Sequence, residues 1–220
     1  MNLLKQTTGQ LALHHPLATQ TLKQMNIDYL NNPHQKLEEA FTSTEDDMIR
    51  MSQQLIQNQC YASEQDDSNL KEYSTSQLID YILWRYHQWH RAQLNALVEL
   101  LDDTPSQHDD QQRLQSEIRA FIHAQTLDLE QHMQKEEAIL FPMMQQNSAI
   151  PKPGPIQVMM REHEIHQSQF PIIDQFICRL NQTPHQALIN RILVHQLNKF
   201  KVDLSIHIHI ENNILFPRFG

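Results

Sequence analysis

One short string of residues, His-x-x-x-Glu-x-x-Ile-Leu-Phe-Pro, occurs twice in this chain. The first copy begins at His132 and the second at His207, 75 positions later (207 − 132). Residues four positions apart lie on the same face of an α-helix, so each copy places its glutamate (Glu136 or Glu211) beside its histidine. Each copy therefore predicts a helix with two metal-ligand side chains, and two such helices in one domain predict a site for two ions.

The composition favours helices and excludes some functions. Only three of the 220 residues are glycine, which argues against a sheet-rich fold with tight turns. The 26 acidic and 17 basic residues give a net charge of −9 without a basic cluster, so we do not expect nucleic-acid binding.

The expected compartment follows from the cysteines and from the apolar segments. Cys60 and Cys178 lie far apart in the sequence, which argues against a disulfide framework and fits a reducing compartment. Residues 1–10 lack the apolar core of a signal peptide, and no stretch approaches the roughly 20 apolar residues of a membrane span. We therefore expect a cytoplasmic protein without a membrane partner.

The pattern of apolar residues divides the chain into three parts. Residues 1–60 are predicted to form a small N-terminal helical domain (the head), residues 61–74 a polar linker, and residues 75–220 a bundle. The bundle helices are expected at about 76–101, 110–144, 156–180 (with a bend at Pro171) and 185–216. Because short breaks separate long amphipathic helices, the predicted fold is all-α, an up-down-up-down four-helix bundle.

Ligand-type side chains interrupt the apolar stripe of each predicted helix. Apolar residues at helical spacing are core by default, but burying polar groups unpaired would cost several kcal/mol each. A shared metal centre removes that cost. The candidate ligands are His87, His132, Glu136, His163, His207 and Glu211.

The depths of the four histidines agree with one shared site. In an up-down bundle the starts of the first and third helices lie beside the ends of the second and fourth. His87 lies 11 residues after position 76, His132 10 before Pro142, His163 7 after position 156, and His207 10 before Pro217. At about 1.5 Å per residue, all four lie roughly 10 to 17 Å from the same end. The spacings of 45 (132 − 87) and 44 (207 − 163) predict pseudo-twofold symmetry.

This set of ligands favours iron. If both glutamates bridge, each ion receives two histidine nitrogens and two carboxylate oxygens, and an oxo or hydroxo bridge leaves one open position. Nitrogen and oxygen ligands without thiolate suit iron or manganese and do not exclude zinc. We favour two iron ions because such a site can bind O2 or NO.

Other polar residues near the predicted ligands have less specific assignments. His90 and His166 share the inner stripes and are alternatives as further nitrogen ligands, although a hydrogen-bonding role is favoured for both. Residues expected to orient the ligand imidazoles are Glu137, Glu162, Asp203, Tyr86 and His90.

The segments around these positions resemble a known family. They read Tyr86-His87-x-x-His90, His132-x-x-Lys-Glu-Glu-x-Ile-Leu-Phe-Pro, Glu162-His163 and His207-x-x-x-Glu-Asn-Asn-Ile-Leu-Phe-Pro-Arg. They are similar to the hemerythrin-like di-iron proteins that repair iron–sulfur clusters, the repair-of-iron-centres family, over nearly the whole chain. The resemblance implies a non-haem di-iron centre in a four-helix bundle. It also implies repair of clusters damaged by nitric oxide or oxidants, through iron donation or handling of NO, with damaged iron–sulfur proteins as partners.

The head departs from that family. The family carries a Tyr-Cys-Cys-Gly-Gly motif where this chain reads Tyr29-Leu30-Asn31-Asn32-Pro33, so no thiol is present there. The resemblance therefore does not extend to thiol redox or thiol capture of a partner, and docking is the alternative role for the head.

Three other functions stay open at this point. The first is a hemerythrin-like carrier or sensor of O2 or NO without repair activity. The second is a redox enzyme, an NO reductase or a peroxidase-like protein, and the third is a bundle that holds zinc for stability alone. A homodimer is a further open alternative.

Overall fold

The computed structural model describes residues 3–14, 17–40, 50, 67–103, 109–146, 154–183 and 188–219. Within these ranges the regular structure is helical, apart from one isolated bridge between Thr7 and Lys36. The bundle consists of α5 (Thr75–Ile82), η3 (Leu83–His87) and α6 (Gln88–Asp103); α7 (Asp109–Lys135), η4 (Glu136–Leu140) and α8 (Phe141–Gln145); α9 (Gly154–Ser168) and α10 (Phe170–Asn181); and α11 (Leu188–Ile210), η5 (Glu211–Leu215) and η6 (Phe216–Phe219). None of the helices described here combines the length and apolar character that a membrane span requires.

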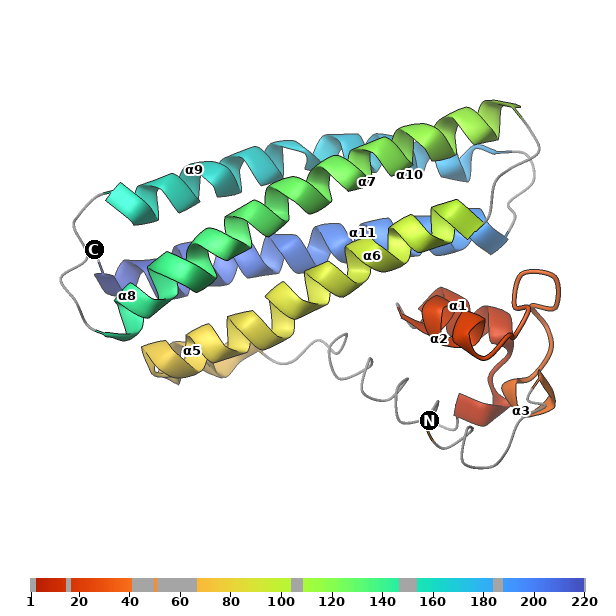
Figure 1. Cartoon of the computed structure of the whole chain (residues 1–220), viewed down its shortest axis with the longest axis horizontal. Coiled ribbons are helices and arrows are strands. Elements are labelled where there is room, and N and C mark those ends of the chain that lie inside the picture. The colour runs from red at the N-terminus through yellow and green to blue at the C-terminus, as the bar shows by residue number, and fades with distance from the viewer. Residues whose placement is uncertain are drawn as a thin grey trace.

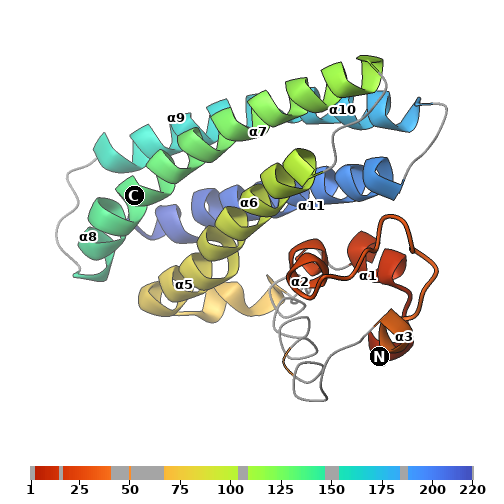
Figure 2. The same cartoon turned by 45° about the vertical axis from the view of Figure 1, so that its right-hand side comes forward.

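Successive rods of the bundle run in opposite directions (Figures 1 and 2). The first rod passes through α5 and α6, the second returns through α7 and α8, the third follows α9 and α10, and α11 returns last. α6 packs against α7 and α11, α10 packs against α11, and α9 packs against α7. The predicted all-α bundle with up-down-up-down order is therefore confirmed.

Local sequence sets the ends and breaks of these helices. Ser74 accepts a hydrogen bond from the backbone N–H of Gln77, and the Gln77 side chain accepts one from the backbone N–H of Ser74. This capping box satisfies N–H groups that the first helical turn leaves free. The helix is interrupted at Gln169, between α9 and α10 and two residues before Pro171, which has no N–H to donate.

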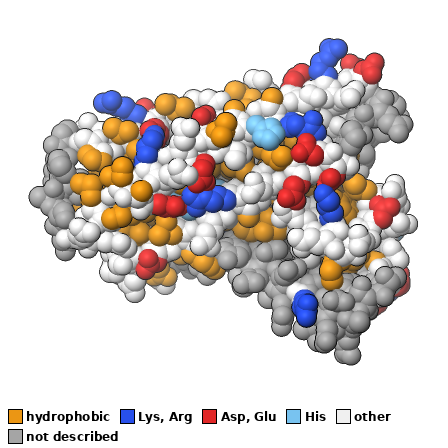
Figure 3. Space-filling model, in the orientation of Figure 1, with side chains coloured by type: hydrophobic (Ala, Val, Ile, Leu, Met, Phe, Trp, Pro, Cys, Tyr) orange, Lys and Arg blue, Asp and Glu red, His pale blue; other side chains and the backbone are white. Residues whose placement is uncertain are grey.

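The buried apolar side chains form two separate clusters. The head-side core includes Leu97, Ile122, Leu193 and Leu197 from the half of the bundle near the head. The far core includes, at the other end, Leu78, Ile82, Phe141, Leu215 and Phe216. Among the described residues, six buried histidines complete the interior, and histidine is scarce on the face shown in Figure 3 although the chain contains 14. They are His87, His90, His132, His163, His166 and His207.

The head packs on the bundle rather than standing apart from it. Its described elements are η1 (Leu3–Lys5), α1 (Thr8–His14), α2 (Ala18–Gln24) and α3 (Leu37–Ala40). α1 contacts α11 and α2 contacts α6, and Leu11, Leu22 and Leu37 belong to the head-side core. Within the predicted linker, η2 (Asp67–Glu72) places Leu70 in the far core. The domain boundaries themselves stay a prediction, because much of 41–66 lies outside the described residues.

The segment that replaces the family's thiol motif is held against α1. Gly9 donates a backbone hydrogen bond to the carbonyl of Pro33 (3.0 Å), and the Thr8 hydroxyl donates one to the carbonyl of Asn32 (2.8 Å). A Cβ at position 9 would lie 2.8 Å from that Pro33 oxygen, so the close approach requires glycine. The segment is thus a fixed packing element of the head.

A histidine at the junction of head and bundle makes stability depend on pH. Burial lowers the pKa of His195 below 6.5, and His14 and Lys199 lower it further; the rings of His14 and His195 meet edge to face at 6.0 Å. The unfolded chain therefore takes up this proton more readily, so stability falls as the pH drops below about 6.5. We expect metal-free His195→Gln protein to lose less stability than its parent between about pH 7 and pH 5, measured as urea midpoints.

The control for this prediction is His123→Gln, since His123 is exposed on α7. It should keep the parental pH dependence. Equal losses in the His195→Gln variant and the parent would contradict the assignment.

Candidate metal centre

Three of the predicted ligands lie in turns that are wider than an α-helix. His87 ends the π-helical turn η3, while Glu136 begins η4 and Glu211 begins η5. The sequence pattern predicted regular helix at these places. A π-turn bonds each N–H one residue further back and is frequent at functional sites. Here it changes the helical register next to the ligand, while the i, i+4 spacing of each His/Glu pair is kept.

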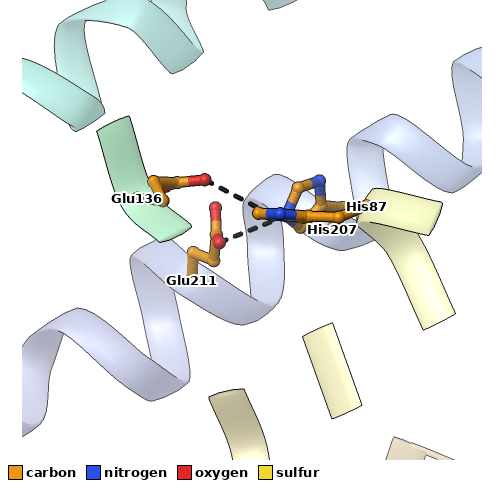
Figure 4. A group of neighbouring side chains, drawn as sticks. All are labelled: His87, Glu136, His207 and Glu211. Atoms are coloured by element: carbon orange, nitrogen blue, oxygen red, sulfur yellow. Dashed lines mark ion pairs between the residues drawn. The ribbon is translucent and has the colours of Figure 1, made fainter. Parts of the chain in front are cut away.

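The structure brings all six predicted ligands together between the two apolar cores. They form two groups, in each of which the ligand atoms lie within 4.8 Å of one another, and all the members are buried. One group contains His87 and His207, the other His132 and His163, and both contain Glu136 and Glu211. Figure 4 shows the first group converging from different rods of the bundle.

Each glutamate turns one carboxylate oxygen to each group. For Glu136, Oε2 lies 3.4 Å from Nε2 of His87 and Oε1 lies 3.5 Å from Nε2 of His132. For Glu211, Oε1 lies 3.1 Å from Nε2 of His207 and Oε2 lies 3.1 Å from Nε2 of His163. Each glutamate therefore contributes one oxygen to each of the two groups of candidate ligands.

The site has an excess of buried polar atoms that a cation would satisfy. Both carboxylate oxygens of Glu136 and of Glu211 are buried without a hydrogen-bond partner, as is Nε2 of His87. Burial and the charge of Glu211 raise the pKa of Glu136 to about 7. Such groups are costly in a protein interior unless a hydrogen bond or an ion compensates them. The nitrogen and carboxylate donors therefore fit iron, with no thiolate among them.

Three of the four candidate ligand imidazoles are oriented by a second hydrogen bond. Nδ1 of His87 lies 2.8 Å from Oε1 of Glu137, and Nδ1 of His132 lies 2.9 Å from Oε2 of Glu162. Nδ1 of His163 lies 2.8 Å from Oδ1 of Asn212. An acceptor at Nδ1 fixes the proton there and leaves Nε2 free to bind an ion.

Two of these acceptors, Glu137 and Glu162, also accept hydrogen bonds from cationic side chains. Arg91 donates to Glu137 (3.0 Å), and Lys135 donates to Glu162 (2.6 Å). The hydrogen bond with His87 lowers the pKa of Glu137, and Arg91 lowers it further. Burial acts in the opposite direction, and the resulting pKa is about 2. Burial alone would lower the pKa of His87, but interactions with Glu136 and Glu137 raise it to about 9.

The orienting residues are partly those that the sequence suggested. Glu137 and Glu162 contact ligand imidazoles, as expected, whereas Asn212 was missed. A signal for it was present, because Asn212 follows Glu211 in the second copy of the repeat as Glu137 follows Glu136 in the first. Aligning the two copies would have assigned it the same role.

Asp203 was expected to orient a ligand imidazole, but it contacts none of them directly. Its carboxylate instead accepts four hydrogen bonds, from Arg85 (3.1 Å), Lys199 (2.8 Å), Trp89 (2.9 Å) and Gln93 (2.9 Å). This buried cluster, the Asp203 network, ties α11 to the first rod beside the site.

His90 and His166 belong to neither ligand group. His90 is fully buried, and its Nδ1 lies 3.3 Å from Oε1 of Gln93. His166 packs against His132, with ring centroids 5.2 Å apart. It borders a cavity of about 230 Å³ whose lining is formed by Asp128, Gln131, Lys135, Glu162, Ile165 and His166. The cavity lies beside the group of His132 and His163.

Comparisons with known proteins agree with this geometry. The family described as "Hemerythrin HHE cation binding domain" matches residues 78–219. A protein of Yersinia pseudotuberculosis serotype O:1b (strain IP 31758) named "Iron-sulfur cluster repair protein YtfE" is 35% identical over 222 residues, which covers 99% of this chain and 98% of that protein. A protein of the same name from Yersinia pestis (strain Pestoides F) is 34% identical with the same coverage. The chain therefore belongs to the hemerythrin HHE cation-binding family and, within it, to the family of the YtfE iron–sulfur cluster repair proteins.

Proposed function

We propose that this protein repairs iron–sulfur clusters damaged by nitric oxide or oxidants, and that its bundle holds two iron ions. The observation that carries the proposal is the pair of buried ligand groups joined by two shared glutamates, in a chain that matches cluster-repair proteins over its full length. Damaged iron–sulfur proteins are then its substrates.

The six buried residues divide the work of holding the ions. His87 and His207 would hold one ion, His132 and His163 would hold the other, and Glu136 and Glu211 would each offer one carboxylate oxygen to both. An oxo or hydroxo bridge would complete the proposed centre. Bound iron supplies a redox-active Lewis acid with affinity for small ligands such as NO and O2. The chain supplies a buried site. It also supplies imidazoles whose Nδ1 atoms are hydrogen-bonded to Glu137, Glu162 and Asn212.

Iron is also the proposed cargo, and the cavity beside the second group supports donation. Asp128 and Glu162 are the acidic residues of the cavity lining next to His166, and a set of carboxylate and imidazole donors can bind iron. The segment Tyr29-Leu30-Asn31-Asn32-Pro33 offers no thiol, so donation here does not use a cysteine pair in the head.

The test is anaerobic incubation of iron-loaded protein with a cluster enzyme damaged by NO. Loading with ⁵⁷Fe allows the transferred iron to be measured together with recovered enzyme activity. We expect both to rise above a control that contains the same amount of free ferrous iron. Transfer that does not exceed this control, with no recovery of activity, would overturn the repair function.

A carrier or sensor of NO or O2 is the second candidate, favoured by the absence of thiols at residues 29–33. The same experiment separates the two functions. A sensor would bind NO reversibly and leave the damaged enzyme inactive.

A further inference from the structure

The pseudo-twofold symmetry of the site is broken at one imidazole. On the third rod Glu162 precedes His163 and contacts Nδ1 of His132. On the first rod the residue before His87 is Tyr86, whose ring stacks on the face of His207, with centroids 5.2 Å apart and planes 4° from parallel. No carboxylate occupies this position, and Nδ1 of His207 is buried without a hydrogen-bond partner.

A second buried nitrogen without a partner lies on the neighbouring ring. Nε2 of His90 is buried and has no hydrogen-bond partner, and the ring centroids of His90 and His207 are 5.3 Å apart. An N–H···N bond between two imidazoles separates their centroids by about 5 Å, since the nitrogens lie about 2.9 Å apart and each lies about 1 Å from its ring centre. The two rings are therefore close enough for such a bond, although their planes are inclined by 35° and the structure records no hydrogen bond between them.

The Asp203 network decides which nitrogen of His90 carries the proton. Asp203 lies between Arg85 and Lys199, so its carboxylate only accepts hydrogen bonds. Gln93 must therefore donate its amide N–H to Asp203, which turns its amide oxygen towards His90. That oxygen accepts the Nδ1 proton of His90, and Nε2 is left as a lone pair.

His207 has the complementary arrangement. Its Nε2 faces Oε1 of Glu211 at 3.1 Å and is the nitrogen available to an ion. A neutral imidazole that binds an ion through Nε2 carries its proton on Nδ1. His207 then has a donor to offer, and His90 has an acceptor.

We infer that His90 becomes the positioning residue for His207 when an ion is bound, accepting a hydrogen bond from Nδ1 of His207 and linking it through Gln93 to Asp203. The inference rests on the proposed metal centre but not on the repair activity. It also makes the two ion positions different. His166 is the counterpart of His90 on the third rod, but His132 already has Glu162 as its partner, so His166 is left at the border of the cavity.

The direct test is nitrogen NMR of zinc-loaded protein with ¹⁵N-labelled histidine. Zinc keeps the centre diamagnetic, so the protonated nitrogen of each ring can be assigned. We expect a proton on Nδ1 of both His90 and His207, and a scalar coupling across the bond between Nδ1 of His207 and Nε2 of His90. A proton on Nε2 of His90 would overturn the inference.

The second test measures stepwise zinc affinity. Loss of a residue that orients a ligand typically weakens binding about 10–100-fold. We expect His90→Phe to weaken the binding of one of the two zinc ions by that factor and to leave the binding of the other nearly unchanged. His90→Gln keeps a hydrogen-bond acceptor and should recover part of the lost affinity. The control His123→Phe replaces an exposed histidine on α7 and should bind as the parent does.

The outcomes separate this inference from the metal centre itself. If the parent binds two ions and His90→Phe binds both as tightly, the inference fails and the metal centre stands. If the parent binds no ion, the metal centre fails, and the positioning role of His90 fails with it.

Discussion

We expect the double variant His132→Ala with Glu136→Ala to lose its iron and all cluster repair. Glu136 belongs to both ligand groups, so its removal weakens both ion positions, and His132 is one of two imidazoles at the second. Iron per chain, measured by elemental analysis after purification, should fall from two ions to near zero. Recovery of an NO-damaged cluster enzyme should fall to the level of the free-iron control.

The matched control changes the same residue types at exposed positions. His123→Ala with Glu164→Ala alters α7 and α9 on their outer faces and should retain iron and activity. Far-UV circular dichroism of both double variants should show parental helix content. Iron and repair that persist in the His132→Ala, Glu136→Ala variant would refute the proposed function.

The largest loss of stability is expected from Asp203→Ala. Asp203 and Arg85 are buried partners with side-chain exposures of 0% and 4%, and removing the carboxylate leaves the guanidinium without its counter-charge. Breaking a buried ion pair from one side costs about 3–5 kcal/mol. The metal-free protein should show this decrease in its free energy of unfolding, measured by chemical denaturation.

Asp174→Ala is the corresponding control on the surface. Asp174 pairs with Lys201 on the neighbouring helix, but its side chain is 56% exposed. Exposed pairs contribute about 0–1 kcal/mol, so this variant should denature almost as the parent does. A similar small effect of both substitutions would show that the Asp203 network does not stabilise the fold.

The bundle and the six buried ligand residues could be predicted from the sequence because both follow from helical periodicity. The repeat fixes a histidine and a glutamate on one face, and residue counts from the helix ends place His87 and His163 at the level of His132 and His207. The structure brings these residues together. That they bind metal stays a prediction.

Other features could not be predicted because they depend on tertiary contacts. Each π-turn adds one residue to a single helical turn. The spacing of apolar residues along a long helix is too coarse to show so small a change. The role of Asp203 depends on donors from a rod more than 100 residues away in sequence, such as Arg85. The contact between Gly9 and Pro33 inside the head could not be predicted either, because it depends on how the two segments fit together in space.

The polar layer of ligands separates the head-side core from the far core, and this division affects how the protein moves. Segments with few apolar contacts to the rest of a protein open locally before the whole molecule unfolds. Departure of the ions would leave the far core, with η2 and η6 at its edge, less firmly coupled to the remainder. The occupancy of the interior would then alter the local dynamics at that end of the molecule.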